Sequence, residues 1–202
     1  MIYLSAALAA PIAGPLLYRL LHDHPRAVRL VDGFVYIAVP ILVAWHILPE
    51  AWLEQSLMTV IAVGLGAILP SAAEQLSNVL RRHTDNLALI VGLSGLILHA
   101  LLEGAALVPT ENGVATPFAL AVLLHRVPVG LVIWWLIRPR YGATLAAAGV
   151  GSILLATVFG FSLGTDVLAS IHGPGSELYQ AFVSGSLVHV VFHQGRHDHT
   201  HE

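Results

Sequence analysis

Residues 96–130 read LILHALLEGAALVPTENGVATPFALAVLLHRVPVG, two apolar segments joined by a short polar loop. The first segment carries His99 and Glu103, and the second carries His125 and Arg126. Ionisable groups within such apolar segments are costly in a bilayer and usually face a bundle interior or a cavity. His99 and Glu103 are four residues apart, so on a helix they lie on one face, one turn apart. An imidazole next to a carboxylate is a nitrogen and oxygen pair that suits zinc and other divalent transition metals.

The composition predicts a membrane protein. Of the 202 residues, 56% are hydrophobic and 10% are charged, whereas a soluble domain carries about 25% charged residues. The chain has no cysteine, so a disulfide framework or a thiolate metal site is excluded. It has no dinucleotide-binding glycine motif, P-loop or nucleophile elbow, and no basic patch for nucleic acid. We therefore expect neither an enzyme nor a nucleic-acid-binding protein.

Further apolar runs lie before and after residues 96–130. Each has about 20 residues, which is the length of a helix that crosses a bilayer. The sequence thus predicts an all-α, polytopic membrane helical bundle with about seven transmembrane helices. Residues 1–192 form one transmembrane domain, and 193–202 form a polar, His-rich cytoplasmic tail. In the sixth run, Gly160 and Gly164 predict a face for close helix packing. The expected spans are 2–21, 33–53, 56–76, 87–108, 117–137, 143–163 and 177–192.

The arginines predict the orientation. The chain has nine arginines and no lysine. If the N-terminus lies outside, every arginine except Arg126 falls on the cytoplasmic side, as the positive-inside rule expects. Seven spans then place the C-terminus in the cytoplasm. We expect a protein of a bacterial cytoplasmic membrane, with the bilayer as its surroundings and a homodimer as one option for its assembly.

Four motifs carry a family resemblance. His99–Gly104 resembles the metal-binding motif in the fourth span of ZIP-type (Zrt/Irt-like) metal transporters, and His125–Gly130 resembles the motif in their fifth. His46–Ala51 is similar to a motif of their second span, and Ser184–His189 to a region of their seventh. The resemblance implies a 3+2+3 arrangement of spans with an incomplete final triplet, and a divalent metal, zinc foremost, as the transported substrate.

Metal ligands follow from these motifs. The resemblance implies a first site of His99, Glu103 and His125, and its further candidate ligands are His46, Glu50 and His189. For the pair of His99 and Glu103, the alternative is a buried hydrogen-bonded pair without a metal.

At three motif positions this chain departs from the family. Ala100 replaces an amide ligand, and Arg126 and Val129 replace carboxylates that help to hold a second metal. An arginine has no lone pair to offer a metal. We therefore expect Arg126 to substitute electrostatically for the second cation, with Glu103 or a backbone carbonyl as its partner. The alternative for Arg126 is snorkelling to the membrane interface.

The tail alternates His197, His199 and His201 with polar residues. Such a tract collects divalent ions weakly, and its alternatives are a plain disordered terminus or an added tag.

The expected function is transport of a divalent transition metal by alternating access around a midplane site. One alternative is a membrane-embedded zinc hydrolase, because His189 and His193 resemble a pair in the last span of ceramidase-like enzymes. Another is a relative of ZIP transporters that binds metal without transporting it.

Overall fold

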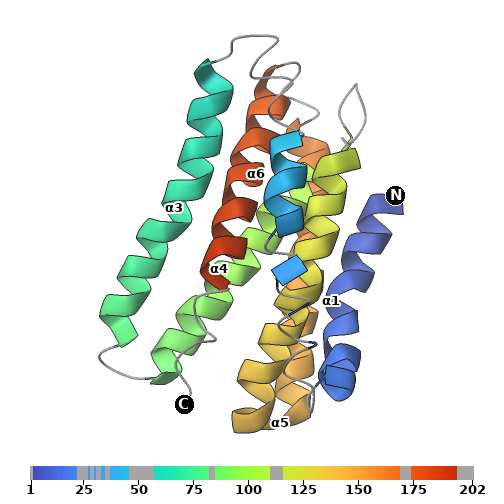
Figure 1. Cartoon of the computed structure of the whole chain (residues 1–202), viewed down its shortest axis with the longest axis vertical. Coiled ribbons are helices and arrows are strands. Elements are labelled where there is room, and N and C mark those ends of the chain that lie inside the picture. The colour runs from blue at the N-terminus through green and yellow to red at the C-terminus, as the bar shows by residue number, and fades with distance from the viewer. Residues whose placement is uncertain are drawn as a thin grey trace.

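Helices make up all the regular structure in the described part of this computed structural model. The structure describes residues 2–21, 57–81, 85–109, 116–168 and 174–194, together with residues 27, 30, 33–34 and 37–45. The expected all-α bundle is confirmed (Figure 1). Residues 37–45 are helical, and the longer helices are α1 (Ile2–Leu21), α3 (Leu57–Arg81), α4 (Asp85–Ala106), α5 (Thr116–Leu168) and α6 (Pro174–Gln194).

The long helix α5 is a hairpin of two arms that meet at Gly142. This glycine has φ 85° and ψ 171°, a backbone conformation that residues with a Cβ rarely adopt. The fifth expected span was to end before residue 138, but helix continues through Pro139 and reverses only at Gly142. In Figure 1 the yellow first arm descends and the orange second arm returns beside it. A Cβ on Gly149 of the second arm would touch Ile133 and Ile137 of the first.

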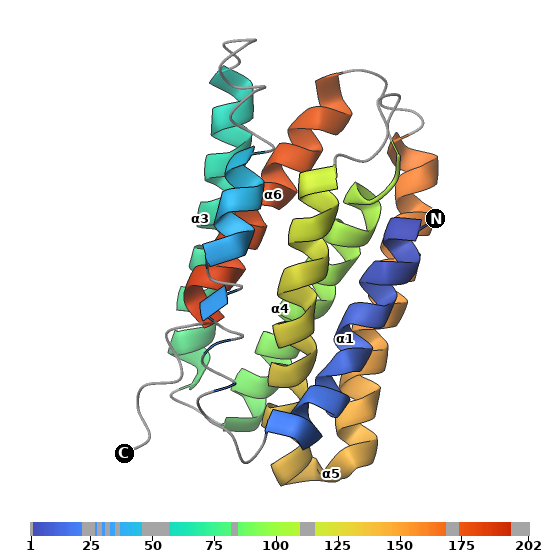
Figure 2. The same cartoon turned by 45° about the vertical axis from the view of Figure 1, so that its right-hand side comes forward.

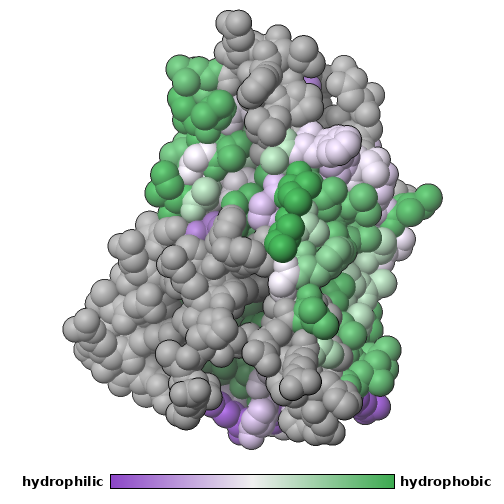
Figure 3. All heavy atoms as spheres, in the orientation of Figure 1, coloured by the Kyte–Doolittle hydropathy of each residue, from purple (hydrophilic) through white to green (hydrophobic). Residues whose placement is uncertain are grey.

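Three described helices are long and apolar enough to cross a membrane. They lie within α1, α4 and α5, and the last of these windows covers both arms of the hairpin. Many large apolar side chains point outward, among them Leu16 on α1, Leu98 on α4 and Leu155 on α5. In the face that Figure 3 shows, hydrophobic residues (green) cover much of the described surface, and several of the most polar ones (purple) lie at its lower end. Extended apolar surface of this kind is typical of proteins that face lipid or a partner.

Glycines allow the helices to approach one another closely at three crossings. Without a Cβ, a glycine lets a neighbouring backbone come into contact, which is a common device in membrane bundles. The close-packing face expected at Gly160 and Gly164 is confirmed, because these residues lie against Leu101 and Ala105 of α4. The other contacts are Gly104 with Thr157, Gly14 with Gly130, Gly130 with Pro11, Gly66 with Phe182, and Gly185 with Val63.

These crossings divide the helices into two groups. In one group α1 and α4 pack mainly on α5, and in the other α3 packs mainly on α6. Figures 1 and 2 show α3 and α6 side by side, with α1 at the opposite edge of the bundle. Hydrogen bonds link α6 to α4: the Tyr179 hydroxyl donates to the Leu102 carbonyl at 2.6 Å, and Gln180 Nε2 donates to the Ala106 carbonyl at 3.4 Å.

We expect Gly160→Ala to destabilise the bundle, because the added Cβ would overlap the Leu101 carbonyl, a backbone group that cannot rotate away. Overpacking of this kind costs about 1–3 kcal/mol. The matched control is Gly151→Ala on the same arm, where a Cβ meets nothing within 4 Å. Thermal unfolding in detergent should show a lower melting temperature for Gly160→Ala alone. Equal melting of the two variants would contradict the close crossing.

Candidate metal centre

Helix α4 presents the first two side chains of the site. His99 and Glu103 are one helical turn apart, and His99 Nε2 lies 2.9 Å from Glu103 Oε1. The Glu103 side chain is 1% exposed, whereas the His99 side chain is 12% exposed. The carboxylate is therefore buried, and the His99 imidazole is the more accessible of the two groups.

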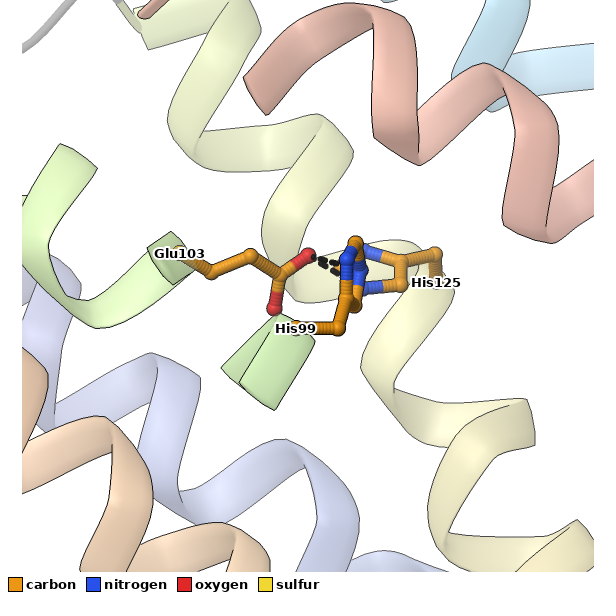
Figure 4. Close-up of side chains that lie close together, drawn as sticks. All are labelled: His99, Glu103 and His125. Atoms are coloured by element: carbon orange, nitrogen blue, oxygen red, sulfur yellow. Dashed lines mark ion pairs between the residues drawn. The ribbon is translucent and has the colours of Figure 1, made fainter. Parts of the chain in front are cut away.

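His125, on the first arm of α5, completes the group. Its Nε2 atom lies 2.7 Å from Glu103 Oε1. Its Nδ1 atom is 2.9 Å from the Ala121 carbonyl, which can only accept, so Nδ1 carries the hydrogen. Metal-binding histidines usually donate their second ring nitrogen to a carbonyl or carboxylate in this way. The rings of His99 and His125 meet edge to face with centroids 5.8 Å apart, and the Glu103 carboxylate points at both (Figure 4).

Three ligand atoms of the kinds that zinc prefers converge here. One atom each from His99, Glu103 and His125 lies within 4.8 Å of the others. None of the atoms His99 Nε2, Glu103 Oε1 and His125 Nε2 makes a hydrogen bond of acceptable geometry within the described part of the chain. Because Nδ1 donates to Ala121, Nε2 is the ring nitrogen of His125 that can offer a lone pair to a cation beside Glu103 Oε1.

The spacing of these atoms fits such an ion after a small expansion. Two ligand atoms of a tetrahedral zinc ion stand about 3.3 Å apart, given bonds of about 2.0–2.2 Å. The contacts of 2.7 and 2.9 Å must therefore widen by about half an ångström. Two imidazoles and one carboxylate are also the ligand set of a class of zinc sites that keep a fourth position open.

Arg126 contacts the second oxygen of the Glu103 carboxylate, Oε2. Its Nε and Nη2 atoms donate to Glu103 Oε2 at 3.1 and 2.9 Å. Its Nη1 atom donates to Thr157 Oγ1 at 2.9 Å and to the Ala7 carbonyl at 3.2 Å. The expected contact with Glu103 or a backbone carbonyl is thus confirmed for both partners. The side chain is 1% exposed, which excludes snorkelling to the interface, and its charge balances that of Glu103.

Two side chains next to the site occupy apolar packing positions. Ala100 and Val129 are both buried, in a hydrophobic cluster that α4 forms with the two arms of α5. Nearby members of this cluster include Ile133 and Ile153. Neither side chain offers an atom that could bind a metal.

Other expected ligands stand apart from this group or outside the described residues. His189 is buried on α6 but is absent from the convergent group. It follows Gly185, which lies against α3, by one helical turn, so it belongs to the side of α6 that faces α3. Several expected metal-binding residues lie outside the part of the chain that the structure describes: His46, Glu50, His197, His199 and His201, together with the side chain of His193.

Two contacts of the site were not anticipated from the sequence. Thr157 is a lone buried hydroxyl in a run rich in glycine and alanine, and its Oγ1 donates to the Ile153 carbonyl at 2.8 Å while accepting from Arg126. The Ala7 carbonyl precedes Pro11 by four residues, so it has lost its helical donor. A proline inside an apolar span is a signal that could have found this acceptor, but not the residue that uses it.

No protein-family model, curated protein or solved structure matches this chain.

Proposed function

We propose that this protein is a polytopic membrane permease, similar to ZIP transporters, that binds a divalent transition metal at His99, Glu103 and His125. Zinc is the foremost candidate, because imidazole nitrogen and carboxylate oxygen suit it. The observation that carries the proposal is the convergence of three buried, otherwise unsatisfied ligand atoms. Burying ionisable groups among apolar helices is costly, and membrane proteins retain such groups where they serve a function.

The proposed topology has seven crossings, with the N-terminus outside and the C-terminus in the cytoplasm. Its support is the distribution of the arginines. The spans match the first seven of the family's 3+2+3 arrangement. This topology places the tail in the cytoplasm, where it would collect metal through His197, His199 and His201.

The proposed mechanism is alternating access. All three ligands belong to the group of α1, α4 and α5, whereas α3 packs mainly on α6. Rocking of these two groups against each other would open the site first to one side of the membrane and then to the other. Because Ala100 and Val129 are packed in hydrocarbon and Arg126 supplies a fixed positive charge, the site holds one metal ion.

A metal-binding protein that does not transport is the second candidate. The observation that favours it is the ion pair of Arg126 with Glu103 at 2.9 Å. This pair neutralises the Glu103 carboxylate, so the site lacks the net negative charge that would draw a dication in from either side. Transport and binding must therefore be measured separately.

We expect His99→Ala to remove the high-affinity metal ion from a folded protein, because it deletes one of the three ligands that the described residues bring together. Joint replacement of His197, His199 and His201 by alanine should leave that ion bound. Metal content of the purified proteins and Zn²⁺ uptake into proteoliposomes measure binding and transport. If the tail variant loses all metal and His99→Ala loses none, the membrane site is not a metal site. Binding without uptake would favour the second candidate.

A further inference from the structure

The guanidinium of Arg126 donates both of its hydrogen bonds with Glu103 to a single carboxylate oxygen. Paired arginines and carboxylates commonly form two parallel hydrogen bonds that engage both oxygens. Here Nε and Nη2 both donate to Oε2, and Oε1 stays with the imidazoles of His99 and His125. The proposed ion needs Oε1, so the orientation of Arg126 decides whether the third ligand is available.

Two anchors, one on the second arm of α5 and one on α1, hold Arg126 in this orientation. Its Nη1 atom donates to Thr157 Oγ1 and to the Ala7 carbonyl of α1. The Thr157 hydroxyl gives its own hydrogen to Ile153, so its oxygen faces Arg126 as an acceptor. Both acceptors engage Nη1, so this nitrogen is not free to donate to Glu103 Oε1.

The acceptor on α1 exists because of a proline. In an ordinary helix the Ala7 carbonyl would accept from the N–H of the residue four positions later, which here is Pro11 and has no N–H. In a membrane, a carbonyl freed in this way needs another donor, and Arg126 provides it at 3.2 Å. Pro15, one turn further along α1, frees the carbonyl of Pro11, but that group lies against Gly130, which has no side chain to donate.

We propose that Pro11 is a positioning residue for the metal centre: it frees the Ala7 carbonyl, which holds Arg126 on Glu103 Oε2 and reserves Oε1 for the ion. This inference rests on the proposed metal site and extends it to α1. Without Pro11, the Ala7 carbonyl returns to its own helix. Arg126 then turns toward the paired arrangement and competes with the metal for Oε1.

Pro11→Ala tests this proposal, since it restores the missing N–H and is compatible with a helix. The probe is Zn²⁺ alone, added to full-length protein in detergent, with His197, His199 and His201 replaced by alanine in every variant. We expect Zn²⁺ affinity to fall by about tenfold, the lower end of the effect of changing a residue that orients a metal ligand. Pro15→Ala is the matched control and should keep native affinity.

A double-mutant cycle separates positioning from a general effect on α1. Arg126→Gln has no Nη1, so adding Pro11→Ala to it should leave Zn²⁺ affinity unchanged. An equal loss in both backgrounds, or no loss in the native background, overturns the inference while the metal site stands. No Zn²⁺ binding by the native chain overturns the proposed function and this inference with it.

Thr157 offers an independent check on the same anchor. Thr157→Ser keeps the hydroxyl and should preserve the Zn²⁺ affinity, whereas Thr157→Val removes the acceptor and should lower it. Thr157→Val combined with Pro11→Ala should bind Zn²⁺ more weakly than either single variant. If Thr157→Ser binds as weakly as Thr157→Val, loss of packing explains the effect and the anchoring role is overturned.

Discussion

Replacing Glu103 with alanine is expected to abolish metal binding and to lower the stability of the protein by about 3–5 kcal/mol. The metal loss follows because Oε1 is the one anionic ligand atom in the convergent group. The loss of stability follows because Oε2 is the acidic partner of Arg126, whose side chain is 1% exposed. Removing one member of a buried ion pair leaves the other charged and unpaired, and that costs more than the pair itself contributed.

A compensating change separates the two roles of Glu103. Combining Glu103→Ala with Arg126→Leu removes both charges, so the melting temperature should recover while metal binding stays absent. The control is Glu177→Ala at the exposed start of α6, which should alter neither quantity. Thermal unfolding and Zn²⁺ titration in detergent measure both effects. Native-like melting of Glu103→Ala would show that the buried ion pair is not needed for stability.

Replacing Arg126 with glutamine is expected to tighten Zn²⁺ binding by at least about tenfold, or about 1.4 kcal/mol. A positive charge close to the site repels the dication by about 4 kcal/mol per pair of unit charges at 4 Å, for an effective dielectric constant near 20. Glutamine removes this charge. Its side-chain nitrogen occupies the position of the arginine Nε atom, which donates to Glu103 Oε2 at 3.1 Å, so one hydrogen bond to the carboxylate can remain.

The same variant should depend on metal for its stability. Without Zn²⁺ the buried Glu103 has lost its counter-charge, so the melting temperature should fall below that of the native protein. Saturating Zn²⁺ should raise it by more than it raises the native value. Arg138→Gln is the control, since that side chain is exposed and stacks on Tyr18 with its Cζ 4.8 Å from the ring. Weaker Zn²⁺ binding in Arg126→Gln would mean that holding Glu103 in place outweighs the repulsion.

The length of the apolar runs, the spacing of residues within single helices and the composition were enough to predict the fold class and part of the site. Apolar runs of bilayer length predicted an all-α bundle. The described residues of each expected span are helical, apart from Leu107 and Val108 at the end of the fourth. The spacing of four residues placed His99 and Glu103 on one face, because a helix repeats every 3.6 residues. Composition alone also excluded thiolate ligands. These conclusions needed no knowledge of how distant segments meet.

Only the tertiary structure decided which groups share Glu103. His125 and Arg126 are adjacent in sequence, yet one faces Oε1 and the other Oε2, an arrangement that depends on how α5 crosses α4. The tertiary structure also placed His189 on the side of α6 that faces α3, and it brought Thr157 and the Ala7 carbonyl to Arg126. Helical periodicity relates residues within one helix. Contacts between helices depend on where glycines such as Gly104 and Gly130 let backbones touch, and that is settled by the packing of the whole bundle.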